Sequence, residues 1–253
     1  MFPLKDNIPT DRTPYVTIAL IVINVIAYFL LQRGGILSGP SDSGVFDYGA
    51  IPYEITHPGE QCEIVQSGTA VACGDGVDGP PAILTAFTSM FMHGSLLHIG
   101  GNMLFLWIFG NNVEDSMGHV KFLIFYLLGG IAALLAQTLI DVDSAIPTIG
   151  ASGAVAAVLG GYILLHPHAR VITLIFIIFF FTIVELPAMV VLGLWFVLQL
   201  GYGALEVSAP AAGGGGGVAY FAHIGGFVFG LLLIKLFASR SKDYTVPPKY
   251  PVY

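Results

Sequence analysis

Four polar residues stand in otherwise apolar stretches of this sequence, and their types are those used in hydrolytic catalysis. They are His98, Asn102, Ser152 and His223. A serine becomes a competent nucleophile when an adjacent base takes its proton, and histidine is the usual base. Backbone N–H groups at a helix start can bind a developing oxyanion. Each residue alone also fits a structural role, because such groups bond to their own backbone or to a neighbouring helix.

The spacing of these residues favours a shared site. His98 and Asn102 are four residues apart, so they lie on one face of a helix. Ser152 follows Gly150 at a loop-to-helix junction, where free N–H groups and the positive end of the helix are close to its hydroxyl. Polar groups at membrane depth are costly, and their presence there indicates function.

Small residues form matching faces on two of the expected helices. The first face consists of Gly153, Ala157, Gly160 and Gly161. The second consists of His223, Gly226 and Gly230. Because small faces let two helix backbones approach closely, we expect His223 to come within hydrogen-bond reach of Ser152.

The composition indicates a membrane protein. Of the 253 residues, 55% are hydrophobic and only 10% are charged, against about 25% charged residues in soluble domains. The net charge is −7 and the few cations are scattered, so we predict no nucleic-acid partner. The histidines form no ligand cluster, and we predict neither a metal site nor a cofactor.

The apolar segments predict an all-α membrane protein with six transmembrane helices. The expected spans are 14–31, 96–109, 121–140, 152–165, about 186–202, and 218–237. Residues 171–184 are expected to form an interfacial or re-entrant connection. The predicted organisation is a polar tail over 1–13, a transmembrane domain over 14–238 that contains a long extracytoplasmic loop at 34–82, and a second tail over 239–253.

The basic residues predict the orientation. With six spans, one side receives Lys5, Arg12, Lys121, Arg170, Lys235, Arg240, Lys242 and Lys249. Only Arg33 lies on the other side. The positive-inside rule then places both termini in the cytoplasm and the protein in the cell membrane as a multi-pass protein. Cys62 and Cys73 both fall in the outer loop, where we expect them to pair; two independent thiols are the alternative.

From about residue 83 to residue 237 the chain resembles a rhomboid-family intramembrane serine protease. The matching stretches are His93–Asn102, Trp107–Gly110 with Glu114 and Gly118, Gly150–Gly153 with Gly160, and Ala222–Gly226 with Gly230. The resemblance implies a rhomboid-like six-helix bundle. It also implies cleavage of transmembrane protein substrates inside the lipid bilayer.

The resemblance assigns the residue roles. Ser152 would be the nucleophile and His223 the general base, in a dyad without a carboxylate. His98, Asn102 and the backbone N–H of Ser152 would line the oxyanion hole. We expect Gly150, Gly153 and Gly226 to free the backbone around the nucleophile and to let the two helices approach. The fifth helix and the glycine run 213–217 would form a lateral gate and a mobile cap.

One departure from the family pattern concerns the base. Some members carry an aromatic residue four positions after the serine, packed on the base histidine, whereas this chain has Ala156. Another group, for example from the last helix, must then hold His223. The main alternative function is a catalytically silent rhomboid-like protein that binds membrane helices. A transporter or channel is a second alternative, although no inverted repeat supports it.

Overall fold

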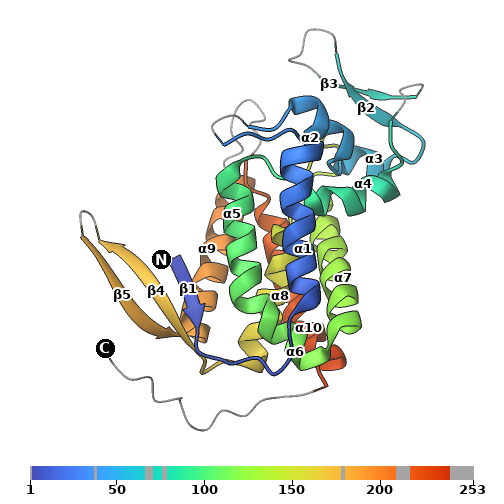
Figure 1. Ribbon diagram of the computed structural model, residues 1–253. Helices are drawn as coiled ribbons and strands as arrows, with labels where there is room; N and C mark the ends of the chain where they lie inside the picture. The colour runs from blue at the N-terminus through green and yellow to red at the C-terminus, as the bar shows by residue number, and fades with distance from the viewer. Residues whose placement is uncertain are drawn as a thin grey trace.

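The computed structural model describes residues 2–36, 39–65, 71–75, 79–177, 180–208 and 217–239. Within these ranges the chain forms an upright bundle of long helices (Figure 1). A group of smaller elements covers one end of the bundle, and a sheet lies along its side (Figure 1).

The protein is mostly helical. The described α-helices are α1 (Tyr15–Ile26), α2 (Asp42–Tyr48), α3 (Pro52–Thr56), α4 (Ala82–Thr88), α5 (Leu96–Phe105), α6 (Asn111–Met117), α7 (His119–Thr138), α8 (Ser152–Leu165), α9 (Ala188–Ser208) and α10 (Tyr220–Phe237). The shorter turns are the π-helical η1 (Ala27–Leu31) and η3 (Leu106–Gly110) and the 3-10 turn η2 (Ser89–Phe91). The strands are β1 (Phe2–Asp6), β2 (Gln61–Ile64), β3 (Val71–Gly74), β4 (Arg170–Ile177) and β5 (Phe180–Pro187).

Three of the described helices are long and apolar enough to cross a membrane alone. They are α7, α9 and α10. A fourth candidate is the pair Ala82–Phe91 and Leu96–Met117, whose two halves meet at a bend of 81°. Two apolar helices are shorter, Tyr15–Leu31 and Ser152–Leu165. The helix predicted to stop near residue 110 continues through η3 to Met117, where Gly118 at a φ of +82° ends it.

Helix α8 is the centre of the bundle. Every residue from Gly153 to Tyr162 is buried. Against α10 the two backbones touch, because a Cβ added to Gly160 would overlap the carbonyl of Phe227 and one added to Gly230 would overlap the carbonyl oxygen of Ala157. The small faces of these two helices therefore meet, as their sequences predict.

A buried carboxylate joins the start of α1 to α6. Glu114, which is 1% exposed, accepts hydrogen bonds from the backbone N–H groups of Val16 and Thr17 at 2.9 and 2.8 Å. The Thr17 hydroxyl donates to the same carboxylate at 2.7 Å, and His119 contacts it at 2.5 Å. The first N–H groups of a helix lack partners within the helix, so Glu114 supplies them for α1.

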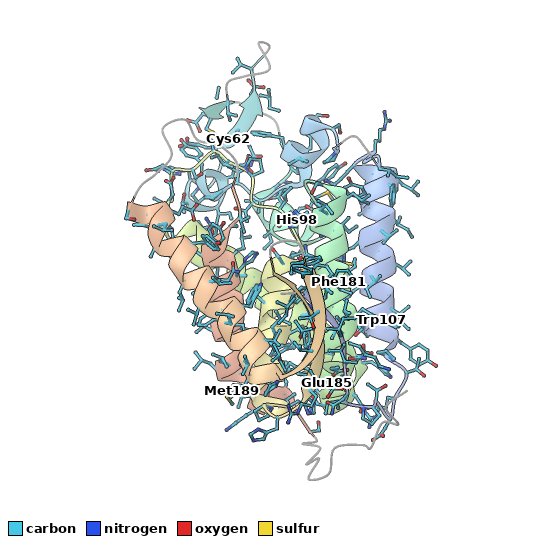
Figure 2. The ribbon with its side chains drawn as sticks, turned by 90° about the vertical axis from the view of Figure 1, so that its left-hand side faces the viewer. Cys62, His98, Trp107, Phe181, Glu185 and Met189 are labelled. Atoms are coloured by element: carbon cyan, nitrogen blue, oxygen red, sulfur yellow. A yellow bond between two sulfur atoms is a disulfide. The ribbon has the colours of Figure 1, made fainter. Side chains whose placement is uncertain are left out.

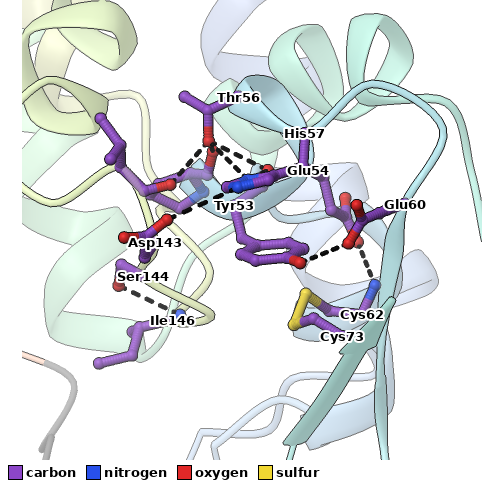
Figure 3. Close-up of a disulfide and its surroundings, with 12 residues drawn as sticks. Tyr53, Glu54, Thr56, His57, Glu60, Cys62, Cys73, Asp143, Ser144 and Ile146 are labelled. Carbon is purple, nitrogen blue, oxygen red and sulfur yellow. Dashed lines mark hydrogen bonds and ion pairs between the residues drawn. A yellow bond between two sulfur atoms is a disulfide. The ribbon is translucent and has the colours of Figure 1, made fainter. Parts of the chain in front are cut away.

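The described part of the 34–82 region is folded onto the bundle end rather than being an open loop. Strands β2 and β3 pair antiparallel, and a disulfide joins Cys62 to Cys73 across them (Figure 3). From α3, the Thr56 hydroxyl donates to the Val142 carbonyl at 2.7 Å. These contacts hold the region against the turn between α7 and α8.

The all-α prediction is wrong over β2 and β3, and also over residues 2–6, 170–177 and 180–187, where the chain forms a three-stranded sheet in the order β1-β4-β5. Strands β4 and β5 make an antiparallel hairpin that projects beside the bundle (Figure 1). Figure 2 shows Phe181 and Glu185 along this hairpin, next to the start of α9 at Met189. The run 171–186 is dense in β-branched and aromatic residues, whose side chains suit a strand better than a helix. The predicted connection is therefore a β-hairpin, and the following helix extends to Ser208.

The predicted polar tail over residues 1–13 also contains structure. Strand β1 pairs with β4, and the Asp6 carboxylate accepts hydrogen bonds from Asn112 Nδ2 and Tyr162 O–H, both at 2.6 Å. Asp6 is 7% exposed, and burial raises the pKa of its carboxyl to about 6. This carboxyl ties the N-terminus to α6 and to the end of α8.

Candidate active site

Ser152 begins α8 directly after a tight turn. Gly150, at a φ of +123°, adopts a backbone conformation that favours glycine. Its N–H donates to the Ser89 carbonyl at 2.9 Å, and Thr148 pairs with Ala50 of the covering region. The chain just before Ser152 is thus fixed by backbone hydrogen bonds at Thr148 and at Gly150. As the first residue of α8, Ser152 presents an N–H without an intrahelical partner.

His98 lies against the same turn. A Cβ added to Gly150 would lie 2.8 Å from His98 Nε2 and 3.4 Å from Ser152 Oγ. The imidazole and the hydroxyl therefore flank Gly150, and a side chain at this position would displace the ring. Figure 2 shows His98 near the end of the bundle that the Cys62 region covers.

The hydrogen bonds of His98 make it a donor toward this site. Gly94 N–H donates to Nδ1 at 3.4 Å. Because Nδ1 then accepts, the proton of the neutral ring is on Nε2. Ser95 Oγ accepts from the His98 backbone N–H at 3.1 Å and starts α5.

Asn102 follows one turn further along α5 on the same face. It is 8% exposed, and its Nδ2 has no hydrogen-bond partner among the described residues. Buried amide donors are almost always paired, so an unpaired one needs an explanation. A negatively charged oxygen that forms only during a reaction provides one.

His223 is held by α9. Its Nδ1 lies 2.8 Å from Gln199 Oε1. The indole of Trp195 lies beside it, with 5.7 Å between the ring centroids and 37° between the planes. The missing aromatic residue on α8 is therefore replaced from α9, not from the last helix as the sequence suggests.

The nucleophile and base candidates occupy neighbouring levels of α8 and α10. A Cβ on Gly226 would overlap the carbonyl oxygen of Gly153, and a Cβ on Gly153 would lie 3.7 Å from the Ala222 carbonyl. Within the described part of the chain, no hydrogen bond joins Ser152 Oγ to His223; the ring bonds to Gln199 instead.

Ala156 has a packing reason to be small. It is fully buried, and a Cβ on Gly226 would lie 3.3 Å from its methyl group. An aromatic side chain in its place would push α10 away.

The expected lack of a metal site and the expected glycine cap both remain predictions. Among the described residues no group of three or more potential ligands could hold a metal ion. Residues 209–216, which include most of the expected cap, lie outside the described residues.

Sequence reasoning missed Gln199 and Trp195. Gln199 is 9% exposed in the middle of an apolar helix, so the rule applied to the other four polar residues would have selected it. Trp195 precedes it by four residues on the same helix face.

The comparisons with known proteins identify the family. The Rhomboid domain model matches residues 80–240, so the chain belongs to the rhomboid family. "Rhomboid protein 1, mitochondrial" of Saccharomyces cerevisiae is 32% identical over 150 residues, 57% of this chain and 39% of that protein. "RHOMBOID-like protein 4" of Arabidopsis thaliana is 33% identical over 143 residues, 56% of this chain and 31% of that protein. "Presenilin-associated rhomboid-like protein, mitochondrial" of Bos taurus is 31% identical over 96 residues, 37% of this chain and 26% of that protein. The chain thus spans less than half the length of these relatives.

The predicted cell-membrane location is contradicted by these names. Both the yeast and the bovine relatives are named as mitochondrial proteins. The prediction rested on the distribution of basic residues, which distinguishes the two sides of a bilayer and carries no information about which membrane it is.

Proposed function

We propose that this chain is an intramembrane serine endopeptidase. Ser152 is its nucleophile, His223 its general base, and His98, Asn102 and the Ser152 N–H its oxyanion donors. The observation that carries this proposal is the pair of donors on one face of α5, His98 and Asn102, of which His98 lies against Gly150. His98 is hydrogen-bonded so that Nε2–H faces the turn beside Ser152, and Asn102 Nδ2 is buried without a partner among the described residues.

The chemistry follows from the two histidines. Ser152 Oγ attacks the scissile carbonyl carbon while His223 Nε2 takes its proton. The carbonyl oxygen becomes an oxyanion held by the three donors. The C–N bond then breaks, and the imidazolium gives its proton to the leaving amine. A water molecule hydrolyses the acyl-enzyme with His223 again as base, which restores Ser152.

The lack of a Ser152–His223 hydrogen bond among the described residues is compatible with this role. Catalytic hydrogen bonds are often long without substrate and tighten only in the reacting complex. Because the backbones touch at Gly153 and Gly226, the distance that must close between Ser152 Oγ and the His223 ring is small.

We also propose six spans, with transmembrane residues 14–238 and both termini on the side that carries most basic residues. Helix α8 has 14 residues, about 21 Å, against a hydrocarbon thickness of about 30 Å. With its far end at the basic surface, Ser152 lies below the opposite surface, under the 34–82 region. Water then reaches the site from that region. The names of the relatives favour a mitochondrial membrane as the location.

The substrate class that fits is a membrane protein with a spanning helix. A peptide bond inside a helix is shielded by its own hydrogen bonds, so residues that weaken the helix near the cut favour cleavage. The apolar surroundings of the site favour a substrate that enters from the bilayer.

Cleavage of a purified single-span substrate by the purified protein tests the proposal. We expect the native protein to cleave and to react with a fluorophosphonate probe, and Ser152→Ala and His223→Ala to do neither. Ser208→Ala, at the end of α9, is the matched serine control and should behave as the native protein. Full cleavage by Ser152→Ala would refute the assignment. A folded native protein that binds substrate without cleavage or labelling would support the silent rhomboid-like alternative.

A further inference from the structure

His223 can act as a base toward Ser152 only in one of its two neutral forms. In one form the proton is on Nδ1 and Nε2 keeps a lone pair; in the other, Nε2 is protonated and cannot accept. Serine hydrolases fix the useful form with a third group that accepts from the base histidine. A dyad of Ser152 and His223 has no carboxylate to do so.

The group in that position here is an amide. Gln199 Oε1 lies 2.8 Å from His223 Nδ1, and a carbonyl oxygen can only accept a hydrogen bond. With Oε1 as the partner, a hydrogen bond here has its proton on Nδ1 and leaves Nε2 of the neutral ring free to accept from a serine. His98 is the converse case, because a backbone N–H donates to its Nδ1 and leaves the proton on Nε2.

An uncharged acceptor suits position 199, because this position is buried in an apolar helix. Gln199 is 9% exposed in an apolar helix, and a carboxylate there would carry a large desolvation cost. Trp195 limits the ring on a second side, so both the tautomer and the plane of His223 depend on α9. Ser152 and His223 themselves belong to α8 and α10.

We propose that Gln199 is the positioning residue of the base: it fixes the Nδ1–H tautomer of His223 and thereby makes Nε2 the acceptor for the Ser152 proton. This inference rests on the proposed protease function and deepens it. It also makes the base depend on α9, because a displacement of that helix from α10 breaks the hydrogen bond.

The direct test is the tautomer itself. We would record nitrogen NMR spectra of the full chain with ¹⁵N-histidine in detergent micelles and assign the His223 signals with His223→Gln. We expect the proton on Nδ1 in the native protein and a mixture of tautomers in Gln199→Leu. Because this measurement does not require proteolysis, it stands even if no substrate is cleaved. A proton on Nε2 of His223 in the native protein would overturn the proposal.

Kinetics of three variants give the second test. Gln199→Leu keeps the approximate volume and removes the acceptor, so we expect kcat to fall about 10- to 100-fold with KM nearly unchanged. Gln199→Glu keeps an acceptor oxygen at Nδ1. We expect the desolvation cost of the added carboxyl to appear as a lower Tm, while the folded fraction retains most of the kcat. The control is Leu198→Ala at the adjacent, exposed position of the same helix, for which we expect native kinetics.

The outcomes separate a positioning role from a packing role. Equal loss in Gln199→Leu and Gln199→Glu, with both folded by thermal unfolding, would show that shape alone matters and would overturn the proposal. Native kinetics in Gln199→Leu would overturn it as well. If Gln199→Leu does not fold, the His223 spectrum of the native protein and the kinetics of Gln199→Glu test the positioning role. Failure of the proposed function is distinct: the native protein then neither cleaves nor labels, whatever the tautomer.

Discussion

The two faces of α10 are packed in different ways. Toward α8 it presents Gly226 and Gly230, and the two backbones touch. Toward α9 it presents larger groups: Phe227 stacks on Phe196 at 4.3 Å between centroids, and His223 meets Gln199. The first contact therefore leaves no room for a side chain, whereas the second consists of side chains.

This difference separates two requirements of the site. The distance between α8 and α10, which carry the proposed nucleophile and base, is set by backbone contact, which cannot adjust without moving a whole helix. The orientation of the base is set by side chains on α9, which can move while α8 and α10 remain packed. We therefore expect changes on the α8 side to abolish the site and changes on the α9 side to weaken it.

The largest effect is expected from Gly226→Ala. The added methyl group would overlap the Gly153 carbonyl oxygen and force the helices apart. Such overpacking costs about 1–3 kcal/mol or more, and we expect cleavage and probe labelling to fall below detection. Thermal unfolding in detergent measures the stability loss. The matched control is Gly201→Ala on α9, where an added Cβ meets nothing within 4 Å; equal losses in the two variants would remove the distinction between the contacts.

A smaller effect is expected from Trp195→Ala. The variant removes the ring beside His223 while leaving Gln199 in place. An aromatic contact of this kind corresponds to about a 3- to 10-fold change in kcat, with little change in KM. Steady-state cleavage measures it against Leu194→Ala, an exposed neighbour. A loss as complete as that of Gly226→Ala would mean that the α9 contact is as indispensable as the α8 contact.

The contact between α1 and α6 is of a third kind, because the buried Glu114 carboxylate makes it. Glu114→Gln removes the charge that accepts from the first N–H groups of α1. We expect a stability loss of about 1–3 kcal/mol, seen as a lower Tm, while the remaining folded protein still labels at Ser152. Glu206→Gln at the end of α9 is the control, with an unchanged Tm expected. Loss of labelling in the folded fraction would mean that the site also depends on the contact between α1 and α6.

The smallest effect on cleavage is expected at the far end of α8, where Asp6 is bonded to Tyr162, and the change to be measured there is in stability. Burial raises the pKa of Asp6 to about 6, above that of the unfolded chain, so protonation favours the folded form. Its contribution is fully present below about pH 4 and is lost as the pH rises through about 6. Relative to Asp6→Asn, the native protein should lose about 1–2 kcal/mol of stability between about pH 5 and pH 8. Parallel Tm profiles of the two proteins would contradict this assignment.

Much of the helical bundle could be predicted from apolar length alone. Helix α8 begins at the predicted residue, Ser152, because the glycine and the turn before it mark a helix start. The length and apolarity of the run before α9 do not predict the hairpin of β4 and β5, because they suit a membrane segment equally well. Only its density in β-branched and aromatic residues favours strands. The pairing of β1 with β4 joins residues far apart in the chain, such as Asp6 and Val171, and no local pattern reports it.

The sequence by itself determined the membrane class, the family resemblance and the candidates for the reacting groups, because composition and residue type limit what chemistry is available. It also determined that α8 and α10 can touch, since only glycines permit that approach. The tertiary structure decided which hydrogen-bond partners the rings of His98 and His223 meet, from which we infer the tautomer of each, and which helix holds His223. Those properties depend on the partner that each ring meets. Gln199 reaches His223 only when α9 packs on α10, whereas Gly94 meets His98 within four residues of chain.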